Sequence, residues 1–312
     1  MKVVCELPLR GAGGEPISFA RTIHSHGCAR LAPAAIEASP LAYRRRFRVG
    51  ARVIDVRLRE RDENLVVEAP ALRRPEAHLL KAAIARMFRL HDDLSPFYER
   101  IAGDALLGWA TRGAGRILAS PTVFEDVIKT ICTTNCAWSA TIRMTRALSE
   151  LDGGAFPEAA TLAATPESWF REVARMGYRG PYVRAIARGV VSGELDLESL
   201  IDAPPDADAA IEGTLLALPG IGPYGAAHVM QLLGRHGSLV LDSWTRPKYR
   251  RLAGKKQAAD STIRRAFARY GGYAGLAFWL YLTRDWLDDE ERSAGEALAS
   301  ERSEPENAGG ER

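Results

Sequence analysis

The sequence predicts an α+β fold, in which an N-terminal antiparallel β-sheet domain precedes a mostly α-helical core. Residues 46–69 alternate apolar and polar side chains and break at the turn-forming run RDEN, which is typical of a β-hairpin. From about residue 76 to residue 287, apolar residues recur at helical spacing in short segments that Gly and Pro separate. We therefore expect a β-rich domain over residues 1–75 and a helical core over residues 76–287.

The composition is that of an ordinary globular protein. The chain has 312 residues, enough for two or three domains with their own cores, and 46% of them are hydrophobic. It has no signal-peptide pattern and no run of about 18 apolar residues, so we expect a cytoplasmic protein with no membrane segment. Four cysteines without a CxxC pair indicate a reducing compartment. The charged tail, residues 288–312, is expected to be disordered.

The first helices of the core are predicted from two segments. Over residues 76–90, one apolar face is formed by Leu79, Ala83, Ile84, Met87 and Phe88. Over residues 120–148, Ser120 is a suitable N-cap and Pro121 suits the first helical position. The buried face of that helix is predicted to comprise Phe124, Val127, Ile128 and Ile131. The run TTN at 133–135 then interrupts the helical pattern, and a second helix begins near Ala137.

Residues 217–230, ALPGIGPYGAAHVM, predict a helix–hairpin–helix with its hairpin at 218–223. Both flanks carry helical apolar spacing, and Pro223 suits the first turn of the second helix. Gly220 and Gly222 permit backbone angles that other residues avoid, and they leave the peptide N–H groups accessible. A phosphate can bind at such a helix N-terminus. A plain glycine turn between two helices is the alternative.

Asp242 is the carboxylate that the pattern places closest to the hairpin. It ends the apolar stretch LVL, precedes a predicted helix and follows Tyr224 by 18 residues. One helix and a short return span that distance, so we expect Asp242 near the N-terminus of the second hairpin helix. Asp242 then either presents its charge to that helix N-terminus or serves as the N-cap of the helix that follows it.

The stretch LPGIGPYGAAHVM…VLDSWTRPKY is similar to the helix–hairpin–helix DNA glycosylase superfamily, in the branch of 3-methyladenine glycosylase II and the 8-oxoguanine glycosylases. Three further stretches, FEDVIKTICTTNCAW, ARMGYRGPYVRAIA and GGYAGLAFWLYL, resemble this branch in the same order. The resemblance covers about residues 76–287 and, more weakly, the β-rich region. It implies a glycosylase core of two helical lobes with the active-site cleft between them.

The resemblance also implies a role for each matching position. Asp242 matches the catalytic aspartate. The DNA-backbone contacts are implied at Gly220, Ile221, Gly222, Tyr224 and Gly225. Asn135, Tyr178 and Arg179 match the residues that fill the gap left by the flipped nucleotide and contact the orphaned base. The base pocket is implied to include Tyr224, His228, Phe278 and Trp138.

At several positions the sequence differs from the family pattern, and these differences limit which reactions the resemblance implies. Tyr224 stands where bifunctional members carry the lysine that forms a Schiff base, so lyase chemistry is not expected. Lys248 lies on the helix after Asp242 and is not a replacement. Ala140 stands where the 8-oxoguanine enzymes use an arginine to read the opposite cytosine. No cysteine follows Cys136, so the iron–sulfur loop of another branch is absent.

The implied function is base-excision repair, by monofunctional hydrolysis of the N-glycosidic bond of a flipped, alkylated purine of the 3-methyladenine type. Two alternatives remain open, an oxidised-purine (8-oxoguanine type) glycosylase without lyase activity and a non-catalytic protein that binds lesions. The expected partner is double-stranded DNA with a damaged base, bound by a monomer that is nucleoid-associated if the source is a prokaryote.

No cofactor and no metal are expected from the sequence. His24 and His26 are two residues apart but lack a third ligand in register. The arginine run at 43–48 is expected to be a solvated strand face rather than a DNA contact.

Overall fold

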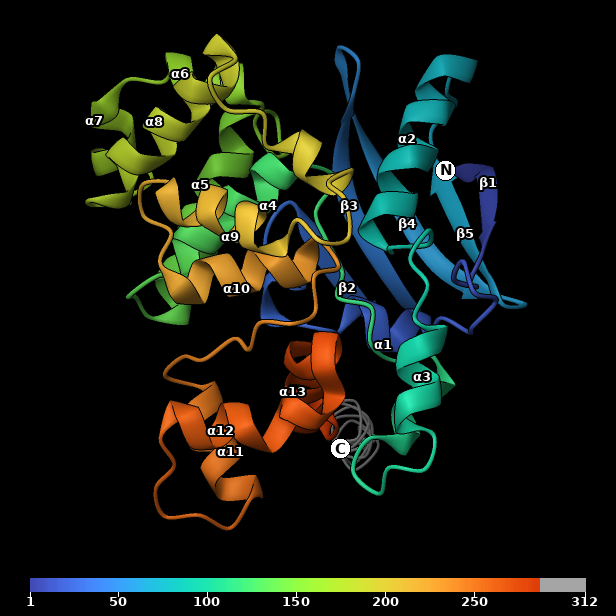
Figure 1. Ribbon diagram of the computed structural model, residues 1–312. Helices are drawn as coiled ribbons and strands as arrows, with labels where there is room; N and C mark the ends of the chain where they lie inside the picture. The colour runs from blue at the N-terminus through green and yellow to red at the C-terminus, as the bar shows by residue number, and fades with distance from the viewer. Residues whose placement is uncertain (287–312) are drawn as a thin grey trace, which may run out of the picture.

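A computed structural model describes residues 1–286 of the chain. It contains a β-sheet with a covering helix and two groups of helices beside it (Figure 1). This is the predicted α+β architecture. The predicted disordered tail at 288–312 lies outside the described residues.

The five strands form one antiparallel sheet in the order β1-β5-β4-β3-β2. Their bounds are β1 (Lys2–Pro8), β2 (Ala34–Ala38), β3 (Leu41–Val49), β4 (Arg52–Arg61) and β5 (Asn64–Ala69). β4 and β5 form the predicted hairpin, with Arg61 opposite Asn64 at the turn. Ile54, Val56 and Leu58 are buried while Asp55 is exposed, so the alternation in the sequence corresponds to an apolar and a polar face.

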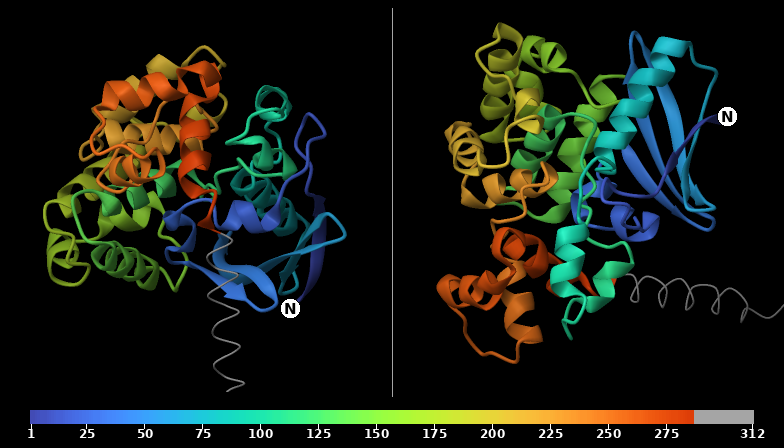
Figure 2. Two further views of the ribbon diagram at one scale, coloured as in Figure 1. Left: turned by 90° about the horizontal axis from the view of Figure 1, so that it is seen from below. Right: turned by 45° about the vertical axis from the view of Figure 1, so that its right-hand side comes forward.

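Helix α2 (Arg74–Met87) packs on the apolar face of this sheet (Figures 1 and 2), and the short helix α1 (Phe19–Ile23) joins the same core. The predicted helix is confirmed, but its buried face differs by one position. Leu80 is buried with Ile84 and Met87, whereas Leu79 is 57% exposed. Residues at i, i+4 and i+7 share one helix face, and the sheet is covered by that face. The core of the β-rich domain therefore extends past residue 75.

The first helical lobe is built around α4, whose predicted apolar face is buried. Its helices are α4 (Val123–Thr133), α5 (Trp138–Leu151), α6 (Ala159–Ala164), α7 (Glu167–Glu172), α8 (Arg179–Ser192), α9 (Asp208–Ala217) and α10 (Pro223–Leu232), with a 3₁₀ turn η3 (Glu198–Ile201). The N-cap of α4 is Thr122, whose hydroxyl accepts the Glu125 amide at 3.2 Å, rather than Ser120. The amide of Ser120 instead donates to Asp126. The break at 133–135 separates α4 from α5, as predicted.

The second helical lobe combines segments from both sides of the first lobe in the sequence. It contains α3 (Ser95–Ile101), η2 (Gly108–Arg112), α11 (Thr245–Leu252), α12 (Asp260–Phe267), η4 (Ala268–Tyr273) and α13 (Ala274–Thr283). Every residue of α13 is buried. The chain passes from α10 in the first lobe to α11 in the second, and Asp242 lies on that connection (Figure 1).

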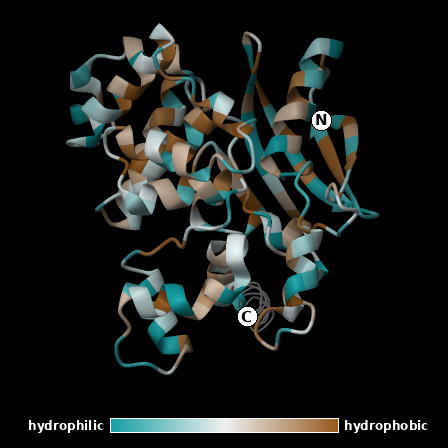
Figure 3. Ribbon diagram, viewed as in Figure 1, coloured by the Kyte–Doolittle hydropathy of each residue, from teal (hydrophilic) through white to brown (hydrophobic). Residues whose placement is uncertain are grey.

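Most helices carry both hydrophobic and hydrophilic residues, which is typical of helices that bury one side (Figure 3). Within residues 1–286, no helix combines the length and apolarity that crossing a bilayer requires.

Candidate active site

The hairpin between α9 and α10 is a tight turn that the first lobe holds in place. The Ile221 amide donates to the carbonyl of Leu218 at 3.2 Å, and the Ile221 side chain is buried in the lobe core. Gly220 has φ +86°, and a Cβ at this position would collide with the ring of Tyr182. Only glycine meets both conditions. Because its amide is already bonded, Ile221 contributes to the turn rather than offering an N–H group to a ligand.

The start of α10 is uncapped and accessible. Gly222 occupies the N-cap position with open space where a Cβ would lie, and no side chain accepts from the first turn. Pro223 at the first helical position has no N–H to satisfy. The amides of the first turn, including those of Tyr224 and Gly225, therefore carry the partial positive charge of a free helix N-terminus. Such an end favours an anionic ligand.

A cleft of about 590 Å³ opens beside this helix end. It brings together the predicted residues Asp242, Tyr224, Asn135 and Tyr178, which come from four different parts of the chain. Its lining residues are Thr133, Thr134, Asn135, Cys136, Tyr178, Tyr182, Gly220, Gly222, Pro223, Tyr224, Gly225, Leu241, Asp242, Ser243 and Arg246. None of these residues is a lysine.

Asp242 lies in the turn that leads into α11 (Thr245–Leu252), whose N-cap residue is Trp244. Its Oδ1 accepts the amides of Trp244 at 2.8 Å and Thr245 at 2.6 Å, while the Asp242 amide donates to the Thr245 hydroxyl at 2.8 Å. These bonds cap the chain entering α11 and fix the carboxylate. Oδ2 accepts no hydrogen bond from residues 1–286, and the half-buried side chain lines the cleft. One oxygen therefore holds the turn before α11, and the other is left for a ligand in the cleft.

Tyr224 forms an aromatic wall of the same cleft. Its ring lies parallel to His228, with 6.2 Å between ring centroids and 10° between planes, and its hydroxyl is 3.3 Å from that of Thr133. Burial raises the pKa of the Tyr224 phenol above its usual value, so the hydroxyl is neutral at neutral pH. Burial also lowers the pKa of His228 to about 4, which leaves an uncharged ring behind Tyr224.

Asn135 and Tyr178 form the exposed rim of the cleft. Asn135 lies at the tip of the loop between α4 and α5 with φ +45°, a left-handed conformation that asparagine tolerates better than most residues. Its amide nitrogen is 3.5 Å from the Tyr178 hydroxyl. The Tyr178 ring is 50% exposed and meets Tyr182 edge to face at 5.9 Å. This rim presents a polar tip and a flat ring to solvent.

Arg179 lies behind the rim rather than in it. Its guanidinium donates to the carbonyl of Thr134, with Nε at 3.2 Å and Nη2 also in contact, and the side chain is buried. It also covers the ring of Tyr178 at 4.5 Å. With the bond from Nη1 to the Met176 carbonyl at 3.4 Å, these contacts use three of the five N–H donors of Arg179, and its contact with an orphaned base stays a prediction.

The structure does not bring Phe278 and Trp138 into the cleft with Asp242. Phe278 is fully buried in the second lobe, 5.2 Å from the ring of Phe267. Because α13 is apolar on every side, its periodicity could not indicate which residue faces a pocket. Trp138 is 46% exposed and packs over Gly27, where it lines a second hollow of about 470 Å³.

Eight cleft residues were not among the predicted site residues: Thr133, Thr134, Cys136, Tyr182, Pro223, Leu241, Ser243 and Arg246. Tyr182 belongs to the GYRGPYV stretch, so the motif itself contained the signal. Thr133 and Arg246 likewise lie in the stretches FEDVIKTICTTNCAW and VLDSWTRPKY, so those motifs contained them as well. Arg246 binds Asp260 at 2.8 Å and lines the cleft beside Asp242, whereas Lys248 is held by Asp285 at 2.9 Å and does not line it.

The sequence matches no protein-family model and no curated protein at a significant level. Solved structures do match over most of their length. The 3-methyladenine DNA glycosylase from Archaeoglobus fulgidus superposes with a TM-score of 0.68 at 20% identity, covering 89% of this chain and 97% of that one. MBOgg1, solved with a low-affinity DNA ligand, gives 0.67 at 20% identity, with coverages of 90% and 95%. The apo 8-oxoguanine glycosylase/lyase of Clostridium acetobutylicum gives 0.65 at 20% identity, with coverages of 86% and 94%.

The superpositions include the sheet domain as well as both helical lobes, because they span about nine-tenths of this chain. At this identity, similarity establishes the fold and not the reaction. The resemblance that the four sequence motifs predicted is thereby confirmed at the level of architecture, and the chain has the fold of the helix–hairpin–helix DNA glycosylases.

Proposed function

We propose that this protein is a monofunctional DNA glycosylase of base-excision repair, which hydrolyses the N-glycosidic bond of a damaged purine flipped out of double-stranded DNA. The observation that carries the proposal is the position of Asp242. Its carboxylate lies in the same cleft as an uncapped helix N-terminus and an aromatic wall. These parts suit a nucleotide, whose phosphate is anionic and whose base is flat.

Asp242 supplies the charge that the reaction needs. Cleavage of an N-glycosidic bond builds positive charge on the sugar, as in glycoside hydrolysis generally. A carboxylate about 4 Å away stabilises that charge by about 4 kcal/mol at an effective dielectric of about 20. This corresponds to about a thousandfold in rate. The backbone amides that hold Oδ1 pre-orient the group, so no reorganisation is needed during the reaction.

Two features support hydrolysis without lyase chemistry. A lyase step requires an amine that attacks C1′, and the cleft lining contains no lysine. The nearest lysine in sequence, Lys248, is paired with Asp285. The Tyr224 hydroxyl stays protonated and is a poor nucleophile. Water is therefore the nucleophile, oriented by Asp242.

The alkylated purines are the substrate class that the cleft favours. A 3-methyladenine-type base is cationic, leaves readily and is attracted to electron-rich rings through cation–π contact. Tyr224 offers such a face, and the ring of His228 lies parallel behind it. The occupied donors of Arg179 and the alanine at position 140 give less support to the 8-oxoguanine alternative.

Base release from a panel of duplexes tests the proposal. The panel contains 3-methyladenine, 7-methylguanine, hypoxanthine and 8-oxoguanine, and borohydride trapping is run on the same samples. We expect release of the alkylated bases and no covalent adduct. Release of 8-oxoguanine alone would favour the oxidised-purine alternative, and an adduct would contradict monofunctional chemistry.

Asp242→Asn separates catalysis from binding. Asparagine caps helices as well as aspartate does, so the fold is retained while the charge is lost. We expect release to fall about a thousandfold with DNA affinity unchanged or higher. The matched control is Asp196→Asn, an exposed aspartate that accepts the Ser199 amide at a helix start away from the cleft. A wild-type protein that binds damaged duplexes but releases no base would instead be a lesion-binding protein.

A further inference from the structure

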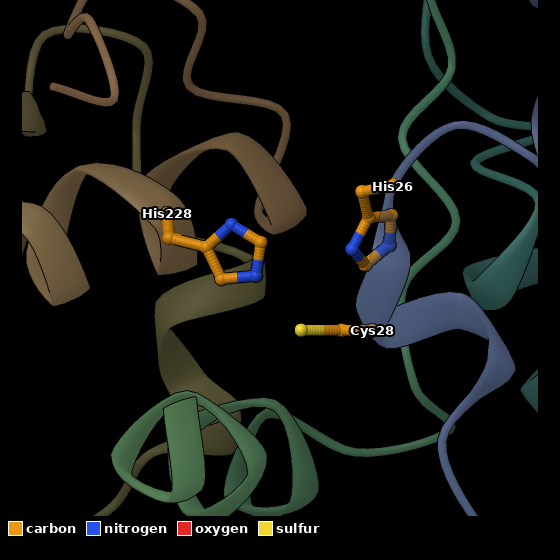
Figure 4. A group of neighbouring side chains, drawn as sticks. All are labelled: His26, Cys28 and His228. Atoms are coloured by element: carbon orange, nitrogen blue, oxygen red, sulfur yellow. The ribbon is translucent and has the colours of Figure 1, made fainter. Parts of the chain in front are cut away.

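Three potential metal ligands meet behind the aromatic wall of the cleft, where the N-terminal segment passes α10. His26 and Cys28 lie at the 3₁₀ turn η1 (Gly27–Arg30), and His228 projects from α10 toward them (Figure 4). One ligand atom from each side chain lies within 4.8 Å of the other two. Figure 4 shows a ring nitrogen of each histidine and the sulfur of Cys28 directed into the same space. His24, the predicted neighbour of His26, is not part of this group and contacts Arg30 instead.

Both histidines present a buried nitrogen without a hydrogen-bond partner. His26 Nε2 is 2.7 Å from the carbonyl of Leu118, so it carries the proton and donates, and Nδ1 is left with a lone pair. His26 Nδ1 and His228 Nε2 are both buried and have no partner within residues 1–286. The two side chains are 4% and 5% exposed. Buried polar atoms are almost always satisfied, so a pair of unpartnered nitrogens facing one space indicates an occupant.

The space itself has the size of a single particle. The enclosed cavity that His26, Cys28 and His228 line measures about 10 Å³, which admits about one water-sized particle. Asp126 and Lys129 also line it. Asp126 binds Arg86 and the Ser120 amide, and Lys129 binds Glu125, so neither group satisfies the orphaned nitrogens.

We propose that His26, Cys28 and His228 bind one Zn²⁺ ion. Two imidazole nitrogens and a thiolate are typical zinc ligands, and three protein ligands leave a fourth position for water. The bond from His26 Nε2 to a backbone carbonyl is the outer contact that metal-binding histidines usually make. Zinc holds its ligand atoms about 3.3–3.6 Å apart. Small side-chain rotations therefore bring the three atoms to that spacing.

The ion would join the N-terminal segment around η1 to helix α10 of the first helical lobe. Cys28 and His26 precede the sheet strands β2 and β3, whereas His228 lies one turn after Tyr224 on α10. His228 stacks on Tyr224, so a metal that fixes His228 also fixes the aromatic wall of the cleft. The zinc ion is thus a positioning element and takes no part in bond cleavage.

Metal analysis of the untagged full-length protein tests this site, because a polyhistidine tag would itself bind zinc. We expect close to one zinc per chain after purification without chelators. Cys28→Ser and His228→Asn are expected to reduce the zinc content at least tenfold. The matched controls are Cys5→Ser, another half-buried cysteine, and His236→Asn, another buried histidine with an unpartnered nitrogen; both should retain zinc.

Cobalt substitution gives a second readout that depends on the sulfur. Co²⁺ added to the chelator-treated protein should produce a thiolate-to-metal charge-transfer band that Cys28→Ser lacks and Cys5→Ser retains. Circular dichroism checks that each variant is folded. If a variant is unfolded, the zinc content and the Co²⁺ uptake of the wild-type protein decide whether the site binds metal. Wild-type protein without zinc that also takes up no Co²⁺ would show that the cavity holds only water and would overturn the proposal. That result leaves base release by Asp242 untouched, since the two sites share no ligand.

Discussion

At the scale of single residues, the two oxygens of the Asp242 carboxylate have different surroundings. Oδ1 is held by the amides of Trp244 and Thr245, and Oδ2 is free of such bonds within the described chain. The sequence left two alternatives for Asp242, an N-cap or a charge near the hairpin; the N-cap of α11 is Trp244, and the role as a charge stays a prediction. Arg179 differs, because its fork of donors is used by the Thr134 carbonyl.

Tyr224 is predicted to act through its ring and not through its hydroxyl. Tyr224→Phe keeps the stack on His228 and loses only the contact with Thr133 at 3.3 Å, so base release should stay within about threefold. Tyr224→Ala removes a stacking surface worth about 1–3 kcal/mol per base, which corresponds to a loss of about 5- to 160-fold. Single-turnover release rates measure both variants. Equal losses in the two would assign the role to the hydroxyl.

Arg179→Ala is predicted to weaken base release by the same factor, whichever base stands opposite the lesion. The guanidinium binds the backbone of the loop that carries Asn135, so its loss releases the loop rather than a base contact. We expect about a tenfold loss, in line with removal of a charged hydrogen bond of about 1.5–3 kcal/mol. Duplexes with each of the four opposite bases provide the measurement. A loss confined to one opposite base would show that Arg179 reads that base directly.

At the scale of elements, the two hairpin glycines have different tasks. Gly220 has positive φ and packs on Tyr182, whereas Gly222 has φ −104° and faces open space. The first position requires glycine for the turn itself. At the second, glycine leaves the start of α10 open to an anion. The turn therefore requires glycine at position 220, and the need for glycine at position 222 stays a prediction about binding.

Gly220→Ala and Gly222→Ala separate these tasks. Gly220→Ala should lower the free energy of unfolding by about 1–3 kcal/mol, because alanine at positive φ is strained. Gly222→Ala should change it by less than about 0.5 kcal/mol, since poorer capping is offset by a stiffer unfolded chain. Gly222→Ala should also bind DNA several-fold more weakly. The slope of its log binding constant against log salt concentration should decrease by about the share of one phosphate contact. Urea unfolding and salt-dependent anisotropy measure the two effects; unaltered DNA binding by Gly222→Ala would remove the helix end from the interface.

At the scale of the whole molecule, a buried ion triad joins the sheet to the first lobe. Arg45 of β3 binds both oxygens of Glu125 on α4, at 2.9 and 2.6 Å, and Lys129 binds Glu125 at 2.7 Å. The sequence predicted a solvated arginine face at 43–48, and this is wrong for Arg45, which is 4% exposed. Strand alternation turns Arg45 to the buried side, where α4 supplies its partner.

Glu125→Gln is predicted to destabilise the protein by about 3–5 kcal/mol at neutral pH, because it leaves two buried cations without their anion. Burial alone would raise the pKa of Glu125, but the charges of Arg45 and Lys129 outweigh it and hold the pKa at about 2. The unfolded chain protonates first as the pH falls. The contribution of the ionised Glu125 to the free energy of unfolding is therefore complete above about pH 4.5 and is lost progressively toward pH 2.

Urea unfolding of wild type and Glu125→Gln between pH 7 and pH 3 measures this dependence. The stability difference between them should shrink as the pH falls below about 4.5. Glu63→Gln is the control, since the exposed pair of Glu63 with Arg10 should contribute less than about 1 kcal/mol. A stability difference that does not vary with pH would place the effect in packing and not in charge.

The sequence by itself determined the architecture and the proximity of Asp242 to the hairpin. Alternation in the strands, the break at 133–135 and the glycine hairpin are local signals, and each depends on neighbours within a few residues. Only the tertiary structure decided which side chains meet across the fold. The burial of Phe278, the capture of Arg179 by a backbone carbonyl and the approach of His26 and Cys28 to His228 all join distant segments. Local periodicity tells which face of an element is apolar, but it carries no information on which element will cover that face.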